Sequence, residues 1–459
     1  MRDDAFYECL KKLFKAVELD NEQEFVALCT KVSSDDRLFI WQGRRSRYCD
    51  KSDTLIHVAA RLGRAWLLRL AMFDGASLSL TSIHNKHPLH EAAQTGAVEC
   101  LRLLICAANV PIDPLKRADW TPLMLACSAS SPEPFTEIND TSQITSRFIE
   151  CVRLLLQHGA DPSFTNKDGW NCLHIAARSG YKEVVSALLQ HSPELIHTKT
   201  SNGRTCLHCL TSRQTSATDP YETCEIAQNL LDRFPQLLFI PDVCGTIPVF
   251  DALRRGNVLL ASELLQVNPD KQLEHCDKLG LKAVHVVAES GELDSLRLIE
   301  KYLGSGTFES KVAFDCVAGI GGVAPLHLAC RSGQHNIVKY ILDVFRKSSA
   351  CDRPLHTLIC PLDVRGCSPM WYAAVGSAGL GATYVTQRIC CLKLLCDALL
   401  AIPHDPETYN FISDHVASIL SNVSNASIRK VLADFVVELV HGNKSVSVTY
   451  NLSFLLYPL

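Results

Sequence analysis

Cysteine and histidine are the residue types of this chain whose spacing could hold a metal ion. Cys206-Leu207-His208-Cys209 places possible zinc ligands within one short segment. A structural zinc site needs four ligands, usually arranged as two pairs, and no second pair follows at a suitable distance. We therefore expect these side chains to pack against the neighbouring residues, and we expect neither a metal ion nor a cofactor.

One other segment resembles a site for catalysis. The glycines of Ala318-Gly319-Ile320-Gly321-Gly322 could form a phosphate-binding loop. Such a loop follows a strand and ends in Gly-Lys-Ser/Thr, and neither feature is present. No Gly-x-Ser-x-Gly nucleophile elbow occurs in a strand–turn–helix context either. The sequence predicts no active site, so we expect the protein not to be an enzyme.

The charge of the chain bears on its partners. Its 459 residues include 45 Lys and Arg against 49 Asp and Glu, a net charge of −4. Nucleic-acid binders usually concentrate positive charge on one face, so no direct nucleic-acid partner is expected. The basic cluster of Arg44, Arg45, Arg47 and Lys51 is interpreted as a solvated loop, with nuclear targeting as the alternative.

Three features indicate the compartment. The start, Met1-Arg2-Asp3-Asp4, lacks the basic and apolar regions of a signal peptide. No segment approaches the roughly 18 apolar residues of a membrane helix. The 21 cysteines are scattered rather than grouped as a disulfide framework. We expect a cytoplasmic protein, with the nucleus as a second compartment, that has no membrane partner and is monomeric by itself.

A four-residue word close to Thr-Pro-Leu-His recurs along the chain and indicates the elements that position these residues. Its copies begin at residues 54, 87, 121, 171, 205, 247, 282, 324 and 368. Residues 54 and 87 are 33 positions apart, and 87 and 121 are 34 apart. A period of about 33 is that of the ankyrin repeat. The sequence predicts an all-α ankyrin-repeat solenoid of about nine helix–turn–helix repeats with hairpin fingers and degenerate terminal caps.

The residues around each word agree with a short helix. The Thr or Ser hydroxyl can cap the helix, and Pro suits its first position. Several copies continue as in Ala176-Ala177-Arg178-Ser179-Gly180, where the small pair allows close helix packing and Gly supplies a left-handed C-cap. A second helix follows with apolar residues at helical spacing, from Val184 to Leu189.

We divide the chain into three parts: a degenerate N-terminal capping repeat at 1–50, ankyrin repeats at 51–402, and a C-terminal cap or extension at 403–459. An insertion near 130–145 is rich in Ser, Pro, Glu, Asn and Thr and is expected to be a mobile loop. The termini should differ from the repeats because a solenoid needs polar outer caps.

Both caps contain helical patterns. A degenerate helix pair is expected at Ala5–Val17 and Asn21–Cys29, and Ser427 is expected to cap a helix that runs through Val440. Apolar and mostly polar residues then alternate from Val446 to Phe454, which indicates an edge strand or a segment that folds on a partner.

Histidine occupies the fourth position of six words. At this position we expect the imidazole to form a hydrogen bond to the loop of the neighbouring repeat rather than to bind metal or act in catalysis. The six are His57, His90, His174, His208, His285 and His327.

The position directly before each word is expected to lie on an exposed finger, where it can vary without touching the core. This column holds Lys86, Trp120, Trp170 and Arg204. Trp and Arg dominate interface hot spots, so we interpret the column as a protein-binding surface. The alternative is that each Trp packs on its own hairpin or under the 130–145 insertion.

Further cations lie on the same fingers. Arg117 and Lys167 stand three residues before Trp120 and Trp170, and Lys116 adjoins Arg117. Arg117 is a further candidate for protein binding, with a solvated cation as the alternative.

Several segments are more specific than the general repeat. They are Pro88-Leu89-His90-Glu91-Ala92-Ala93, the finger from Leu115 to Met124, and Asn166-Lys167-Asp168-Gly169-Trp170-Asn171. With Cys244-Gly245 and Leu279-Gly280 in the same order, they resemble the ankyrin repeat domain-containing protein 16 family over roughly residues 50 to 345. The C-terminal part and the insertion before Thr145 depart from that pattern.

This resemblance implies a function in translational fidelity. Family members bind the catalytic domain of alanyl-tRNA synthetase and take misactivated serine onto lysine side chains, which prevents mischarged tRNA(Ala). Lys167 matches an acceptor lysine of the family. At the equivalent place one repeat earlier stands Arg117, whose guanidinium is no nucleophile at neutral pH, with Lys116 beside it. A third family lysine falls near His197, with Lys199 two residues on.

Two other functions stay open. An ankyrin stack with a short C-terminal module is also the layout of a substrate receptor of a ubiquitin ligase, and Phe454-Leu455-Leu456-Tyr457 faintly resembles the SOCS box of such proteins. The third hypothesis is a generic ankyrin scaffold with an unrelated partner.

Overall fold

A computed structural model of the chain describes residues 4–32, 34–44, 52–107, 109–128, 141–213, 220–304, 307–308, 321–347, 356, 359–375, 382–402 and 406–442. The chain divides into two compact units, Met1–Val243 and Cys244–Leu459. Most of the 130–145 insertion, the Ala318–Ile320 segment, the three basic residues after Arg44 and the alternating C-terminal segment lie outside the described residues.

Within the described residues all regular elements are helices, as expected for an all-α fold. Each of the nine words begins a short inner helix, which confirms the prediction from the repeat. These helices are α4 (Leu55–Leu62), α6 (Pro88–Thr95), α8 (Pro122–Ser128), α10 (Cys172–Ser179), α12 (Cys206–Thr211), α14 (Pro248–Arg254), α17 (Ala283–Ser290), α20 (Pro325–Arg331) and α23 (Pro369–Ala374).

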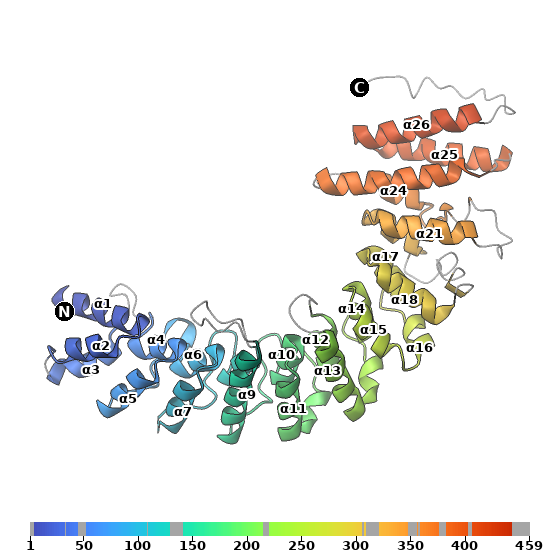
Figure 1. Ribbon diagram of the computed structural model, residues 1–459. Helices are drawn as coiled ribbons and strands as arrows, with labels where there is room; N and C mark the ends of the chain where they lie inside the picture. Colours follow the sequence, from blue (N-terminus) through green and yellow to red (C-terminus); the bar gives the residue numbers. More distant parts are fainter. Residues whose placement is uncertain are drawn as a thin grey trace. The chain divides into compact units, whose positions relative to one another are not determined.

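An outer helix follows each inner helix. The outer helices are α5 (Ala65–Phe73), α7 (Val98–Cys106), α9 (Thr141–Gln157), α11 (Lys182–His191), α13 (Pro220–Arg233), α15 (Val258–Leu264), α18 (Leu293–Leu303), α21 (His335–Lys347) and α24 (Ala382–Leu400). Short helices η1 (Ile83–Asn85), η2 (Pro193–His197), η4 (Pro235–Phe239) and α16 (Pro269–Glu274) lie between repeats. In the first unit the inner helices form one layer and the outer helices a second (Figure 1).

The inner helices begin and end as the sequence indicates. Asn171 Oδ1 accepts from the backbone N–H of His174 at 3.1 Å, and Thr121 Oγ1 accepts from Met124 at 3.2 Å. At Thr54 the hydroxyl instead lies 2.8 Å from His57 Nδ1, so it holds the imidazole rather than the helix backbone.

Small residues let the inner helices pack closely. The Ala pairs of α4, α6 and α10 are fully buried, and α4 packs against α6. The glycine that ends each of these helices adopts a left-handed conformation, with φ of 71° at Gly63, 68° at Gly96 and 77° at Gly180. These are the predicted C-caps.

The word histidines join successive repeats. His57 Nε2 lies 3.0 Å from the carbonyl oxygen of Lys86, and His90 Nε2 lies 3.1 Å from that of Trp120. In the second unit His285 and His327 reach the carbonyls of Val323 and Cys367 in the same way. The predicted hydrogen bond to the neighbouring repeat is confirmed at these four positions, whereas His174 Nε2 is buried without such a partner among the described residues.

Each end of the chain carries extra helices. Helices α1 (Asp4–Glu18) and α2 (Glu22–Cys29) confirm the predicted N-terminal pair, and α3 (Ser34–Gln42) follows with Trp41 buried. At the other end α25 (Pro406–Asn422) and α26 (Ala426–Gly442) pack against each other.

The predicted cap of the last helix is wrong by two residues. Asn425 Oδ1 accepts from the backbone N–H groups of Ser427 and Ile428 at 3.0 and 3.2 Å, so Asn425 caps α26. An Asn side chain caps as well as a Ser hydroxyl does, and the pattern of apolar residues alone does not distinguish the two positions.

No helix of the described residues is long and apolar enough to cross a membrane.

We expect the buried word histidines to make the fold acid-sensitive. Burial lowers the pKa of His90 to about 3 and that of His174 to about 4, and it also lowers the pKa of His57 and His327. Below about pH 6.5 the unfolded chain binds a proton at each such residue that the folded chain does not. Each should therefore remove up to about 1.4 kcal/mol of stability per pH unit as the pH falls from 6.5 toward its folded pKa.

Urea unfolding of the chain at several pH values between 7.5 and 5 measures this slope. His90→Asn should flatten it, whereas His191→Asn, which changes an exposed histidine of α11, should leave it unchanged. Equal slopes in the chain and in His90→Asn would contradict the prediction.

Candidate functional site: the finger row

The fingers of the first unit are held in register by their backbones. The N–H of Arg117 donates to His84 O at 2.8 Å, and that of Lys167 donates to Ala118 O at 3.2 Å. Ser201 and Val243 continue the ladder, since their N–H groups donate to Asp168 O and Asn202 O at 3.1 and 2.9 Å. Each finger is therefore fixed by the one before it, and residues at equivalent places form rows along the unit.

We use the name finger row for the side chains that the ladder and the adjacent inner helices bring together on successive repeats. The finger row consists of Lys116, Arg117, Trp120, Lys167, Trp170, Arg178 and Arg204.

Trp120 packs on its own finger and is only partly exposed. The N–H of Lys116 donates to Trp120 O at 3.1 Å, which closes the hairpin. The Lys116 ammonium lies 5.8 Å from the centroid of the Trp120 ring, close enough for a cation–π contact. This is the packing considered as the alternative to an exposed ring, and it leaves part of the indole accessible.

The turn of this finger contains no glycine. Ala118 and Asp119 both adopt the left-handed region, with φ of 68° and 62°. In the next finger Gly169 supplies a φ of 75° at the place equivalent to Asp119. The conformation is unfavourable for Ala118, so the rest of the finger must stabilise it.

Trp170 lies along the inner helix of its own repeat. Its backbone N–H donates to Asn166 Oδ1 at 2.9 Å, and its ring centroid lies 6.4 Å from that of His174. The exposed guanidinium of Arg178 lies over the ring at 5.4 Å. Sequence analysis did not identify Arg178 as part of the surface. The sequence feature that could have identified it is its place at the end of the inner helix, eight residues after Trp170.

In the first two repeats, too, the residue directly before the word contacts the residue eight positions later on the inner helix. Asp53, directly before the first word, pairs with Arg61, and Lys86 Nζ donates to Gln94 Oε1 at 3.0 Å. The column before the words therefore lies against the inner helices instead of extending from the finger tips. The Arg204 side chain also lies against its own inner helix, because its guanidinium donates to His208 O at 3.1 Å.

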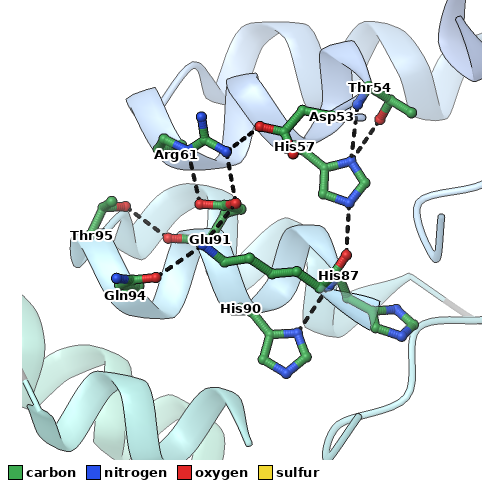
Figure 2. A network of polar contacts seen from close by, with 10 residues as sticks. Asp53, Thr54, His57, Arg61, His87, His90, Glu91, Gln94 and Thr95 are labelled. Atoms are coloured by element: carbon green, nitrogen blue, oxygen red, sulfur yellow. Dashed lines mark hydrogen bonds and ion pairs between the residues drawn. The ribbon is translucent and has the colours of Figure 1, made fainter. Parts of the chain in front are cut away.

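Lys86 belongs to a polar network around the buried Glu91 that the sequence did not reveal. Arg61 donates to both carboxylate oxygens of Glu91, at 2.9 and 2.8 Å, and Lys86 Nζ lies 2.9 Å from Glu91 Oε1. Figure 2 shows Arg61 of α4 reaching across to Glu91 of α6. The Glu91 side chain is 2% exposed. Lys86, predicted as a binding residue, is thus engaged within its own repeat.

The network fixes the charge of Glu91. Burial by itself would raise the pKa of this carboxyl, but the hydrogen bond and charge of Arg61, together with Lys86, outweigh it and hold the pKa below its ordinary value. Asp53 is held low in the same way, against its own burial, by Arg61.

The candidate acceptor lysines differ in environment. Lys167 and Lys199 are exposed, whereas Lys116 is half-buried against Trp120. Burial lowers the pKa of Lys116 and the nearby charge of Lys86 lowers it further, while Glu91 acts in the opposite direction. Of these lysines Lys116 has the clearest physical reason to be neutral more often.

Cys206 and Cys209, whose spacing resembles that of zinc ligands, lie in the core of the repeat. Both thiols are fully buried, and burial raises the pKa of Cys206 to about 12. Over the described ranges no three His, Cys, Asp or Glu side chains come together to hold a metal ion.

Family models match several parts of the chain. The model of three ankyrin repeats matches residues 56–136 and 143–219, and models of a single ankyrin repeat match residues 118–167 and 321–349. The chain therefore carries ankyrin repeats and has the all-α ankyrin-repeat fold.

Curated relatives contain the same repeats. An ankyrin repeat-containing protein of Schizosaccharomyces pombe is 32% identical over 130 residues, which cover 28% of this chain and 50% of that protein. The ankyrin repeat protein nuc-2 of Neurospora crassa is 24% identical over 259 residues, which cover 56% of this chain and 21% of that protein. The chain thus spans half or less of the length of these relatives.

Among solved structures, the ankyrin repeat domain of human ASB11 is similar at 21% identity with a TM-score of 0.42. The similarity covers 54% of this chain and 98% of that one.

We expect Glu91→Gln to destabilise the first unit by about 2 kcal/mol, because it removes a charged, buried acceptor from Arg61. Since the folded pKa of Glu91 is lowered, its contribution is complete above the ordinary glutamate pKa of about 4.3 and is lost as the pH falls below that value. Urea unfolding at pH 7 and pH 4 tests both points.

The matched control is Glu99→Gln on α7, where the carboxylate is 61% exposed and should contribute less than about 0.5 kcal/mol. Equal losses in the two variants would show that the Arg61–Glu91 contact contributes no more than a surface ion pair.

Proposed function

We propose that this ankyrin-repeat chain holds a partner protein on the finger row of its first unit. The observation that carries the proposal is the backbone ladder, which aligns the consecutive fingers of Trp120 and Trp170, each ring with a cation over it. Trp and Arg contribute most to interface hot spots, because large rings and planar guanidinium groups bury much area at low entropic cost. A surface that is rigid before binding also loses little conformational freedom on binding.

We further propose that the partner is the catalytic domain of alanyl-tRNA synthetase and that lysines of the finger region accept misactivated serine. The support is the resemblance of the fingers from Leu115 to Met124 and from Asn166 to Asn171 to the ankyrin repeat domain-containing protein 16 family. The chain then acts as a fidelity cofactor rather than as an enzyme with its own pocket.

The proposed reaction is aminolysis of a mixed anhydride. The neutral Nζ of a lysine attacks the carbonyl carbon of seryl-adenylate, a C–N bond forms, the C–O bond to phosphate breaks, and AMP leaves while the amine loses a proton. An ordinary lysine with a pKa of about 10.4 is neutral in roughly one molecule in a thousand near pH 7.4, so proximity within the complex must supply the rate.

Lys116 is the first candidate acceptor on physical grounds. Its lowered pKa increases the neutral fraction, and the Trp120 ring restricts its position. Lys167 is the candidate by resemblance, and Lys199 is the third. Arg117 cannot take this role because its guanidinium stays protonated.

The test is a pull-down of the chain with alanyl-tRNA synthetase catalytic domain in the presence of ATP and serine, followed by intact-mass and peptide mass spectrometry. We expect binding and a seryl increment on Lys116, Lys167 or Lys199. Lys116→Arg, Lys167→Arg and Lys199→Arg keep the positive charge and should each remove only the increment at that position. Binding without any increment would refute serine acceptance, and absence of binding would refute this partner.

We expect Trp120→Ala combined with Trp170→Ala to leave the helical fold intact but to weaken synthetase binding by about 2–4 kcal/mol. This corresponds to roughly a 30-fold to 1000-fold increase in Kd. The loss of two partly exposed rings removes contact area from the centre of the row. Calorimetric titration measures Kd, and circular dichroism checks the fold.

Trp66→Ala is the matched control, since Trp66 is also partly exposed but lies on outer helix α5 against Phe25. A double variant with the Kd of the unchanged chain would exclude the finger row as the binding surface.

A further inference from the structure

The finger row is positively charged, although the chain as a whole is not. Its five cations, which are Lys116, Arg117, Lys167, Arg178 and Arg204, stand beside the carboxylates of Asp119 and Asp168. The chain as a whole has a net charge of −4. In the part of the chain that the structure describes, Arg117, Lys167 and Arg178 form no ion pair, and all three are exposed.

Two of the cations, Arg117 and Lys167, stand at equivalent places of consecutive fingers and therefore recur at the spacing of the repeats. The five cations lie on or beside inner helices α8, α10 and α12, of which α8 packs on α10 and α10 on α12. Packed helices lie about 8–10 Å apart. An extended peptide rises about 3.3 Å per residue, so about three of its residues span one repeat.

We propose that the finger row binds an extended acidic segment of a partner protein with a carboxylate at about every third residue. Arginine suits this role because its guanidinium binds a carboxylate through two parallel hydrogen bonds. Arg117 and Arg178 lie in consecutive repeats, and Lys167 lies on the finger between them along the chain. The inference rests on the proposed use of the finger row as an interface, but not on the identity of the partner.

Protein is favoured over nucleic acid by the state of the indole rings. Single-stranded nucleic acid binds to such surfaces by stacking its bases on free aromatic faces. Here Lys116 lies over Trp120 and Arg178 lies over Trp170, so a cation already covers a face of each ring. A carboxylate can bind those cations without displacing them from the rings.

The experiment uses the full chain and fluorescein-labelled synthetic peptides. One peptide repeats Glu-Ser-Ala, and the other has the same composition with its glutamates in one block at one end. We expect the periodic peptide to bind at least several-fold more tightly and its affinity to fall as salt is raised from about 50 mM to about 500 mM. Equal affinity for the two peptides, or no binding of either, would overturn the inference.

A triple variant identifies the surface. Arg117→Gln, Lys167→Gln and Arg178→Gln together should weaken binding of the periodic peptide about tenfold. Arg69→Gln, Arg102→Gln and Arg153→Gln form the matched control, because they remove the same charge from outer helices α5, α7 and α9. A similar loss in both triple variants would mean that only net charge matters and would overturn the inference.

Labelled oligo(dT) is measured beside the peptides, and tighter binding of the oligonucleotide would replace the acidic segment by a nucleic acid. The result of the peptide experiment can be distinguished from the result of the synthetase-binding experiment. Trp-dependent synthetase binding without peptide binding would remove this inference alone. Peptide binding without synthetase binding would remove only the proposed partner.

Discussion

The hydrogen bond from a buried imidazole to the next repeat's backbone is the interaction on which the rest of this structure depends. His90 shows both of its ends: Nδ1 accepts from the N–H of His87 at 3.0 Å, and Nε2 lies 3.1 Å from Trp120 O. Because a carbonyl oxygen only accepts, Nε2 must carry the proton and the ring must be neutral. One side chain thus fixes the start of its own helix and the carbonyl of the residue before the next word.

Fixing that carbonyl also fixes the direction of the side chain beside it, which then runs along the inner helix. What the side chain meets there decides its role. Lys86 meets the buried carboxylate of Glu91, and its charge is satisfied within the repeat. In the repeat of Trp170 the position equivalent to Glu91 holds the apolar Ile175, and the ring remains partly exposed under Arg178. Equivalent places along one solenoid therefore serve stability in one repeat and the surface in another.

Sequence patterns within one repeat predicted more of the structure than patterns that relate different repeats. The apolar pattern gave both terminal helix regions, but it placed the cap of α26 at Ser427 instead of Asn425 and gave no indication of α25. The column before the words singled out Trp120 and Trp170, yet it suggested rings on exposed fingers, because a sequence does not state where a side chain lies relative to its own inner helix. Arg178 and Glu91 were missed for the same reason.

The sequence by itself determined the repeat, the inner helices, their glycine C-caps and the structural role of the histidines, because each follows from residues within one period whose backbone preferences and hydrogen bonds are local or repeat regularly. Only the tertiary structure decided the other side-chain and finger contacts. Between repeats these are the Arg61–Glu91 contact and the finger ladder, and within a finger or a repeat they are the cations over the two indoles. Their physical reason is distance in three dimensions: ion pairs and cation–π contacts act over a few ångström between side chains, and stacking of the repeats sets which side chains come that close.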